Sequence, residues 1–180
     1  MDFIVFDLET TCWDGNPPTD IREVIEIGAF KMNVYGEVVE EFSAFVKPTY
    51  YPNLSPYCKN LTSITQEQIN RAQYFPQVMG QFVDWVEDST NDVFLCAWGK
   101  MDKKILQDEC YEHSIEFDSL ENYLDLKKQY HTIKRSKREY GFHNSLKKEG
   151  IEFEGEPHRA KFDAYNLTKL FARYVDQWVY

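Results

Sequence analysis

The first eleven residues place the strongest constraint on what this chain can fold into. An apolar run at residues 3–6 leads into Asp7 and Glu9, and Thr10 and Thr11 follow at once. Residues two apart on a β-strand point to the same face, so the two carboxylates are expected to lie side by side. Two ionised carboxylates that close repel each other, and a bound cation relieves the repulsion. The stretch predicts a buried strand ending in an acidic metal site; the alternative is a strand end whose acids face water.

The size and composition favour one globular domain spanning residues 1–180. A hydrophobic fraction of 43% excludes a disordered chain. The net charge of -10 argues against a protein that holds nucleic acid through bulk positive charge. An acidic balance remains compatible with an enzyme that holds divalent metal.

One segment is basic in this acidic chain. Eight Lys or Arg residues and a single acid, Glu139, lie between Lys127 and Lys148. The run is either a solvated face or a track for a phosphate backbone beside the acidic site. Under the second interpretation the candidate substrate-binding residues are Lys134, Arg135, Lys137 and Arg138.

Cysteine usage and the N-terminus favour a cytoplasmic protein. The four cysteines, at positions 12, 58, 96 and 110, form no C-x-x-C pair and are expected to be free thiols. The acids of the N-terminal stretch do not fit a signal peptide, and no apolar run is long enough to span a membrane. We therefore expect no membrane association.

Apolar runs and turn residues predict an alternation of strands and helices. Runs at 3–6, 23–30 and 38–46 have short connections and predict three neighbouring antiparallel strands. A fourth strand is expected at 92–98, and 123–126 is too short to be told from part of a helix. Helices are expected from the capping box Thr65 to Gln68 onward and over 75–86, 101–111, 142–148 and 159–178.

Further acids stand where these elements begin or end. Asp102 lies in the first turn of a helix after the fourth strand, and Asp163 lies near the start of the last helix, five residues after His158. Taken singly, an acid at a helix start is favoured by the helix dipole, and a histidine on a loop is usually solvated. With Asp7 and Glu9 they make four acids and one histidine at positions where side chains of an α/β fold converge.

This ordered set resembles the DEDDh 3′–5′ exonucleases of the ribonuclease-H-like fold. The stretch from Asp7 is similar to their first motif, Asp102 to the second, and His158 through Asp163 to the third. The Eri1-like exonucleases and their bacterial sporulation-inhibitor-type relatives are the most similar subgroup, over residues 3–171. Two departures are Ser63, where glycine is commoner, and Met101, where an aromatic residue is expected to grip the terminal base.

The resemblance implies a central mixed sheet of five strands, three antiparallel strands first and parallel additions after them, flanked by helices. It implies hydrolysis of phosphodiester bonds from the free 3′ end of single-stranded RNA or DNA with two divalent ions, Mg²⁺ or Mn²⁺. Asp7 is expected to bridge both ions, and Glu9 and Asp163 to complete the ion that holds the attacking water. Asp102 is expected to serve the other ion, and His158 to act as the general base.

Contacts to the substrate end are less sharply specified. Thr10 and Thr11 are candidates to contact the 3′ hydroxyl, and Met101 and Trp98 to line the terminal base. For Trp98 the alternative is core packing, which is common for tryptophan next to a buried strand.

Two other function classes compete with the exonuclease. A haloacid-dehalogenase-type phosphatase also places an acidic pair before Thr, but Glu9 replaces its second Asp and its later metal motif is missing from this sequence. A non-catalytic inhibitor of a sporulation kinase pathway on an exonuclease fold is the second alternative. A protein that had lost catalysis would be expected to lack one of the five motif residues, and all five are present.

Overall fold

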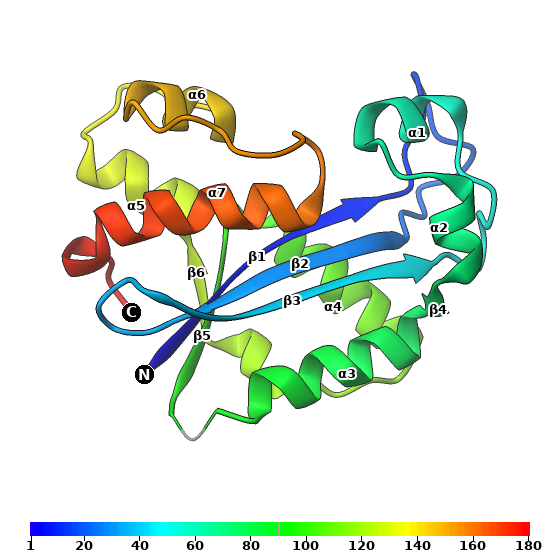
Figure 1. The fold of residues 1–180 in the computed structure, drawn as a ribbon, viewed down its shortest axis with the longest axis horizontal. Helices are drawn as coiled ribbons and strands as arrows, with labels where there is room; N and C mark the ends of the chain where they lie inside the picture. Colours follow the sequence, from blue (N-terminus) through cyan, green and yellow to red (C-terminus); the bar gives the residue numbers. More distant parts are fainter. Residues whose placement is uncertain (90) are drawn as a thin grey trace.

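A computed structural model describes residues 1–89 and 91–180, and in this part of the chain six strands form one sheet (Figure 1). The strands are β1 (Asp2–Thr10), β2 (Val24–Met32), β3 (Val38–Lys47), β4 (Gln73–Tyr74), β5 (Val93–Ala97) and β6 (Tyr123–Asp125). Their spatial order is β4-β3-β2-β1-β5-β6. Strands β1 to β3 are antiparallel, and β4, β5 and β6 each join a parallel partner.

The predicted mixed α/β sheet is confirmed, but the predicted number of five strands is wrong. The extra strand, β4, has two residues and pairs only with Val46 and Lys47 of β3. A two-residue strand carries no alternation of polar and apolar residues by which the sequence could reveal it. The ambiguous run at 123–126 proves to be the strand β6, which continues directly into a helix.

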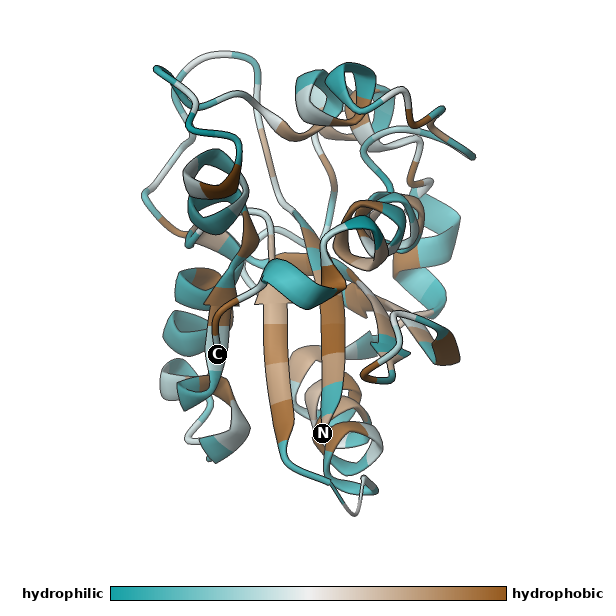
Figure 2. Cartoon of the chain, turned by 90° about the vertical axis from the view of Figure 1, so that its left-hand side faces the viewer, coloured by the Kyte–Doolittle hydropathy of each residue, from teal (hydrophilic) through white to brown (hydrophobic). Residues whose placement is uncertain are grey.

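Helices cover both faces of the sheet. They are α1 (Pro56–Thr62), α2 (Gln66–Arg71), α3 (Phe75–Glu87), α4 (Met101–Glu112), α5 (Leu126–Ile133), α6 (Phe142–Lys148) and α7 (Ala160–Arg173), with short 3₁₀ turns η1 (Asp118–Glu121) and η2 (Val175–Gln177). Figure 1 shows α7 along one face of the sheet and α3 and α4 on the other. Figure 2 shows apolar strands in the interior and polar residues along the outer faces of the helices.

Helix prediction failed where charge or irregular sequence hid the pattern. Helix α1 lies in a segment expected to be irregular, where Ser55 caps it by accepting a hydrogen bond from the Cys58 amide. Helix α5 occupies the start of the basic run and is capped by Asp125. The last helix ends at Arg173 instead of residue 178, and Trp178 reaches the core from beyond the 3₁₀ turn that follows.

Strand β1 explains how the acidic site is positioned. Ile4, Phe6 and Leu8 face the α3 and α4 side and join one apolar core. Phe3 and Val5 face the α7 side and join a second core. Because side chains alternate along a strand, Asp7 and Glu9 continue the α7 face beyond the end of its apolar packing. The first part of β1 therefore packs in the core, and its last part carries the acidic residues of the candidate site.

Across the described residues, no helix is both long enough and apolar enough to cross a membrane.

Candidate active site

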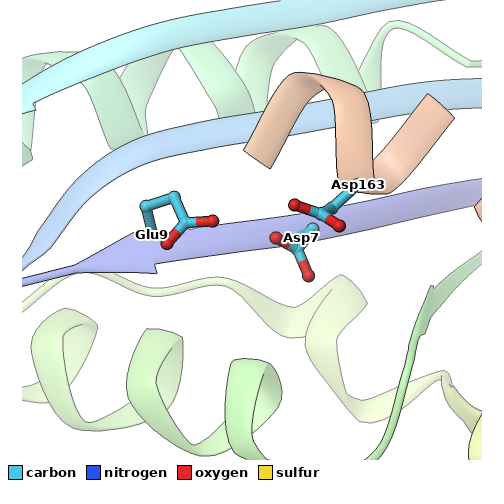
Figure 3. Close-up of side chains that lie close together, drawn as sticks. All are labelled: Asp7, Glu9 and Asp163. Atoms are coloured by element: carbon cyan, nitrogen blue, oxygen red, sulfur yellow. The ribbon is translucent and has the colours of Figure 1, made fainter. Parts of the chain in front are cut away.

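Three carboxylates from two elements converge at the end of β1. Asp7 and Glu9 come from β1 and Asp163 comes from the first turn of α7 (Figure 3). Each residue offers an oxygen, and these oxygens all lie within 4.8 Å of one another. We call Asp7, Glu9 and Asp163 the acid cluster. The geometry brings together residues that are more than 150 positions apart in the sequence.

The start of α7 is held against β2 by a buried ion pair. The Arg159 guanidinium donates two hydrogen bonds of 3.0 Å to Glu26, and the Ala160 amide donates a third of 3.0 Å. Glu26 is 1% exposed, so these three bonds satisfy a carboxylate that would otherwise be costly to bury. Glu26 also pairs with Glu9 in the register of β1 and β2. The ion pair therefore fixes the helix next to the acid cluster.

Gly28 allows the helix to approach this closely. It lies opposite Asp7 in the register of β1 and β2. A Cβ at this position would lie 2.3 Å from the Ala160 carbonyl carbon and 2.3 Å from the Lys161 nitrogen. Any larger side chain would push α7, and Asp163 with it, away from β1.

Burial and mutual repulsion disfavour ionisation of the cluster. Burial is the main cause that raises the pKa of Asp7 well above its usual range, and the charges of Asp102 and Glu9 add to it. Burial likewise raises the pKa of Glu9 to about 8, followed by the charge of Asp163. Burial also raises the pKa of Asp163, although nearby histidines and backbone amides oppose the shift. Such a group of carboxylates fits a multivalent cation.

Asp102, the fourth predicted acid, is not one of the three carboxylates that lie within 4.8 Å of one another. It occupies the first turn of α4 as predicted, directly beyond the end of β5. Burial raises its pKa to about 6, and hydrogen bonds from its own amide and that of Leu8 partly offset the shift. After burial, its charge is the largest cause that raises the pKa of Asp7.

His158 stands in the turn that leads into α7. It is exposed and has a φ of 60°, a left-handed conformation that is uncommon for histidine. Its ring centroid lies 5.8 Å from that of His143, a residue of α6. His143 Nε2 in turn lies 3.6 Å from Asp163 Oδ1. The predicted histidine is therefore at the edge of the acid cluster, and a second histidine accompanies it.

Thr11 and Trp98, two of the residues predicted to contact the substrate end, are engaged within the fold. The Thr11 side chain is buried and accepts a hydrogen bond from the Glu23 amide. Trp98 packs against Tyr130 and Phe142, and its Nε1 is buried without a partner among the described residues. Trp98 thus lies in the packing beneath α5 and α6.

Thr10, which follows Glu9, is partly exposed, and Met101, which precedes Asp102, is exposed. Thr10 follows a register irregularity after Glu9, and its carbonyl accepts a 3.6 Å contact from Cys58 Sγ. Met101 is 55% exposed at the start of α4.

The basic run divides into paired and unpaired cations. Lys134 bonds to Glu149 at 3.0 Å and to the Tyr174 hydroxyl at 3.1 Å, and Lys127 pairs with Glu139 at 3.1 Å. Within the described residues, Arg135, Lys137 and Arg138 make no ion pair and are exposed. The structure thus gives the four candidate phosphate ligands different surroundings.

Sequence reasoning missed two features of the site. His143 sits in a short helix inside the basic run, and no spacing rule relates it to His158 fifteen residues later. The pairing of Glu26 with Arg159 joins residues from β2 and the turn before α7, and only the register of the sheet reveals it.

Comparisons with known proteins agree with this geometry. Residues 4–171 match the family model of the RNase_T exonucleases. The chain is 30% identical to human 3′-5′ exoribonuclease 1, over 94% of this chain and 51% of that protein. It is also 30% identical to the probable 3′-5′ exonuclease KapD of Bacillus subtilis (strain 168), over 93% of this chain and 82% of that protein. The chain spans about half the length of the human relative.

A solved structure supports the same relationship. The nuclease domain of 3′hExo, a DEDDh family member bound to rAMP, superimposes with a TM-score of 0.91 at 28% identity. The match covers 97% of this chain and 92% of that domain. The ribonuclease-H-like fold expected from the sequence motifs is confirmed.

Proposed function

This chain belongs to the RNase_T exonuclease family, and from that premise we propose that it hydrolyses phosphodiester bonds from the free 3′ end of single-stranded nucleic acid. The observation that carries the proposal is the acid cluster, three carboxylates within 4.8 Å of one another, with Asp102 beside it. The names of the relatives, exoribonucleases among them, favour RNA as the first substrate to test. DNA is the second.

The donor set fits hard divalent cations. Asp7, Glu9 and Asp163 offer carboxylate oxygens at short mutual distances, and among the described residues no Lys or Arg forms an ion pair with them. Asp102 extends the set, and we infer two ions, Mg²⁺ or Mn²⁺. When bound, such ions supply Lewis-acid stabilisation of the charge that develops on the phosphate during hydrolysis. The protein supplies the positions of the four carboxylates.

We assign His158 the role of general base. Its imidazole is exposed at the edge of the acid cluster, where water and a substrate phosphate have access. Imidazole is the side chain most often used to take a proton from an attacking water. The His158 backbone is left-handed, and its ring lies 5.8 Å from the ring of His143 between centroids. Strained backbone of this kind clusters at functional sites.

Contacts to the substrate end complete the proposal. Met101 is exposed and free to contact the terminal base, whereas Trp98 supports the surrounding packing from beneath. Thr10 is the stronger candidate to contact the 3′ hydroxyl, since the Thr11 hydroxyl accepts from the Glu23 amide and the Thr11 amide donates to the Glu23 carbonyl. Among the basic residues, Arg135, Lys137 and Arg138 are assigned to phosphate contacts. Lys134 is assigned the smallest contribution to phosphate binding, because it already forms an ion pair with Glu149.

The alternatives receive less support. The antiparallel start of the sheet and the family match argue against a phosphatase of the haloacid dehalogenase type. A binding protein without catalysis remains the competing function, and no contact in the structure favours it over the exonuclease.

Digestion of end-labelled oligonucleotides tests the proposal. RNA and DNA strands with a free 3′ hydroxyl or a 3′ phosphate would be incubated with Mg²⁺, Mn²⁺ or EDTA. Stepwise shortening of the free 3′ end that requires metal is the expected result. His158→Ala should abolish shortening while retaining the nucleic-acid affinity of the wild type. His113→Ala changes a histidine at the end of α4 and is the matched control.

The outcomes separate the two functions. An active His158→Ala variant contradicts the general-base assignment. A folded, metal-loaded wild-type protein that shortens no strand contradicts the exonuclease and favours the binding protein.

A further inference from the structure

Two hollows flank helix α6 and meet at Lys147. One, of about 410 Å³, lies between α6 and residues 150–153 and includes His143 and Phe153 in its lining. The other, of about 320 Å³, is lined by Arg138, Tyr140, Asn144, Lys147 and Lys148. Because Lys147 lines both, the hollows are adjacent parts of one surface. We call this surface, from His143 across α6 to Tyr140, the α6 surface.

The α6 surface begins at the proposed active site. His143 Nε2 is 3.6 Å from Asp163, and the His143 ring lies 4.9 Å from Phe153 and 5.8 Å from His158 between ring centroids. Aromatic rings and an apolar wall suit a sugar or a base better than a phosphate. Glu152, which also lines this hollow, adds a negative charge that points to the same conclusion.

The far end of the α6 surface has the opposite character. Lys148 Nζ lies 4.3 Å and the Arg138 guanidinium 5.2 Å from the centre of the Tyr140 ring. Such cation–π contacts hold long flexible side chains near a fixed aromatic ring. Tyr140 is itself anchored, since its amide donates a 2.9 Å hydrogen bond to the buried His131. Two cations are therefore preorganised at one place on the surface.

These cations have no carboxylate partner among the described residues. Lys127 and Lys134 pair with Glu139 and Glu149, but Arg138, Lys147 and Lys148 enter no such ion pair. In a chain with a net charge of -10, three clustered cations that form no ion pair among the described residues mark a place for an anion. Helical spacing brings Asn144 and Lys148 one turn apart on the same side of α6, where an amide and a cation can contact one phosphate group.

We propose that the α6 surface binds nucleotides upstream of the 3′ end, with their phosphates held by Arg138, Lys147 and Lys148. This inference rests on the proposed function, because it takes the strand that leaves the acid cluster as its ligand. The hollow at His143 and Phe153 receives the nucleotide nearer the acid cluster. The charged hollow at Tyr140 then holds the backbone of the next nucleotides. Arg138 keeps its phosphate contact, and the other main contacts move from Arg135 and Lys137 to Lys147 and Lys148.

Binding measurements in EDTA test the surface without cleavage. Fluorescence anisotropy of a labelled eight-nucleotide single strand would be recorded for the wild type and for Lys147→Gln/Lys148→Gln over a series of salt concentrations. Each lost phosphate contact lowers the salt slope by about 0.7, so the double variant should lose about 1.4. Its affinity should fall on the order of tenfold at low salt.

A matched control removes the same charge elsewhere. Lys47 lies 5.2 Å over the Tyr74 ring, which reproduces a lysine–tyrosine contact on the β3–β4 edge, and Arg71 is exposed nearby on α2. Lys47→Gln/Arg71→Gln should leave the slope at the wild-type value. An equal fall in both double variants contradicts the α6 surface and points to net charge alone.

Cleavage of strands of different length gives an independent readout. The Lys147→Gln/Lys148→Gln variant should lose kcat/KM on an eight-nucleotide strand and keep the wild-type value on a dinucleotide, which is too short to reach the charged hollow at Tyr140. Equal loss on both strands would place the effect in the acid cluster and contradict the proposal. A wild type that cleaves neither strand, but whose binding depends on Lys147 and Lys148, contradicts the exonuclease and supports the binding surface.

Discussion

The acid cluster and Glu149 are both carboxylate sites that are largely shielded from solvent, but the fold gives them different partners. Glu149 accepts hydrogen bonds of 2.8 Å from the hydroxyls of Tyr130 and Tyr174, and it pairs with Lys134 at 3.0 Å. The acid cluster has three carboxylates together, and Asp163 Oδ1 lies 3.6 Å from His143 Nε2. Glu149 is therefore surrounded by hydrogen-bond donors and a cation, whereas the acid cluster concentrates negative charge.

This difference appears in the direction of the pKa shifts. Burial would raise the pKa of Glu149, but bonds from Tyr174, Lys134 and Tyr130 outweigh it and lower the pKa. In the acid cluster burial and like charges act in the same direction and raise the pKa of Asp7 and Glu9. The comparison teaches that burial alone does not identify a functional acid. A functional acid is better identified by the absence of a positively charged partner, because such an acid destabilises the fold unless a cationic ligand binds to it.

Asp7→Asn should give the largest effect. Removal of the central carboxylate should lower the exonuclease rate by at least on the order of 10³-fold, because charge development on the phosphate loses its support. In EDTA the same variant should be more stable than the wild type, on the order of 1 kcal/mol, since a buried like-charge contact is removed. Chemical denaturation and the digestion assay measure the two effects. If Asp7→Asn is less stable than the wild type in EDTA, that result would contradict the view that repulsion between the carboxylates destabilises the metal-free protein.

Divalent metal should stabilise the protein through the acid cluster. At a concentration one hundred times its dissociation constant, a bound ion adds about 2.7 kcal/mol to the free energy of unfolding. Thermal melting with Mn²⁺ or Mg²⁺ should therefore show a raised Tm in the wild type and a much smaller rise in Asp7→Asn. Glu149→Gln is the matched control and should keep the full rise. The same rise in all three proteins would indicate metal binding at another place.

The predictable part of the site follows from local sequence and motif order. Asp7 and Glu9 on one face of a strand follow from the two-residue period, and Asp102 and Asp163 follow from positions at helix starts. The resemblance to a known family added the assignment of His158. The apolar runs were enough to predict the three antiparallel strands, because the runs are distinct and the connections between them are short.

The remaining features depend on contacts between distant segments. Glu149 reads as one acid after a basic helix, and nothing local reveals that Tyr130 and Tyr174 point at it. His143 reaches Asp163 only because α6 packs beside α7. Helix α5 was hidden because its apolar residues are interspersed with lysines, so charge masked the spacing. Tertiary packing determines each of these features, and the local sequence pattern does not reveal them.

Glu149→Gln should have a moderate effect on stability and none on cleavage. The amide keeps an acceptor for a tyrosine hydroxyl but loses the ion pair with Lys134, whose side chain is 41% exposed. We expect a loss of about 1 to 2 kcal/mol in the free energy of unfolding, reduced by solvent screening of the lysine. Urea denaturation measures the loss, and kcat/KM should equal that of the wild type. A large loss of activity would show that the two carboxylate sites are coupled.

The pH dependence of stability should carry the smallest signal, and its sign follows from the lowered pKa of Glu149. Its ordinary value is 4.5, and the folded state lies below that. The contribution of the ionised form is therefore fully present above pH 4.5 and is lost as the pH falls through the folded-state pKa. The stability difference between wild type and Glu149→Gln should stay constant between pH 6 and about 8 and should shrink below pH 4.5, by less than about 1 kcal/mol. Denaturation curves at a series of pH values measure it. A difference that widened on acidification would mean that Glu149 is protonated in the fold, which Tyr130, Tyr174, Lys134 and Arg173 oppose.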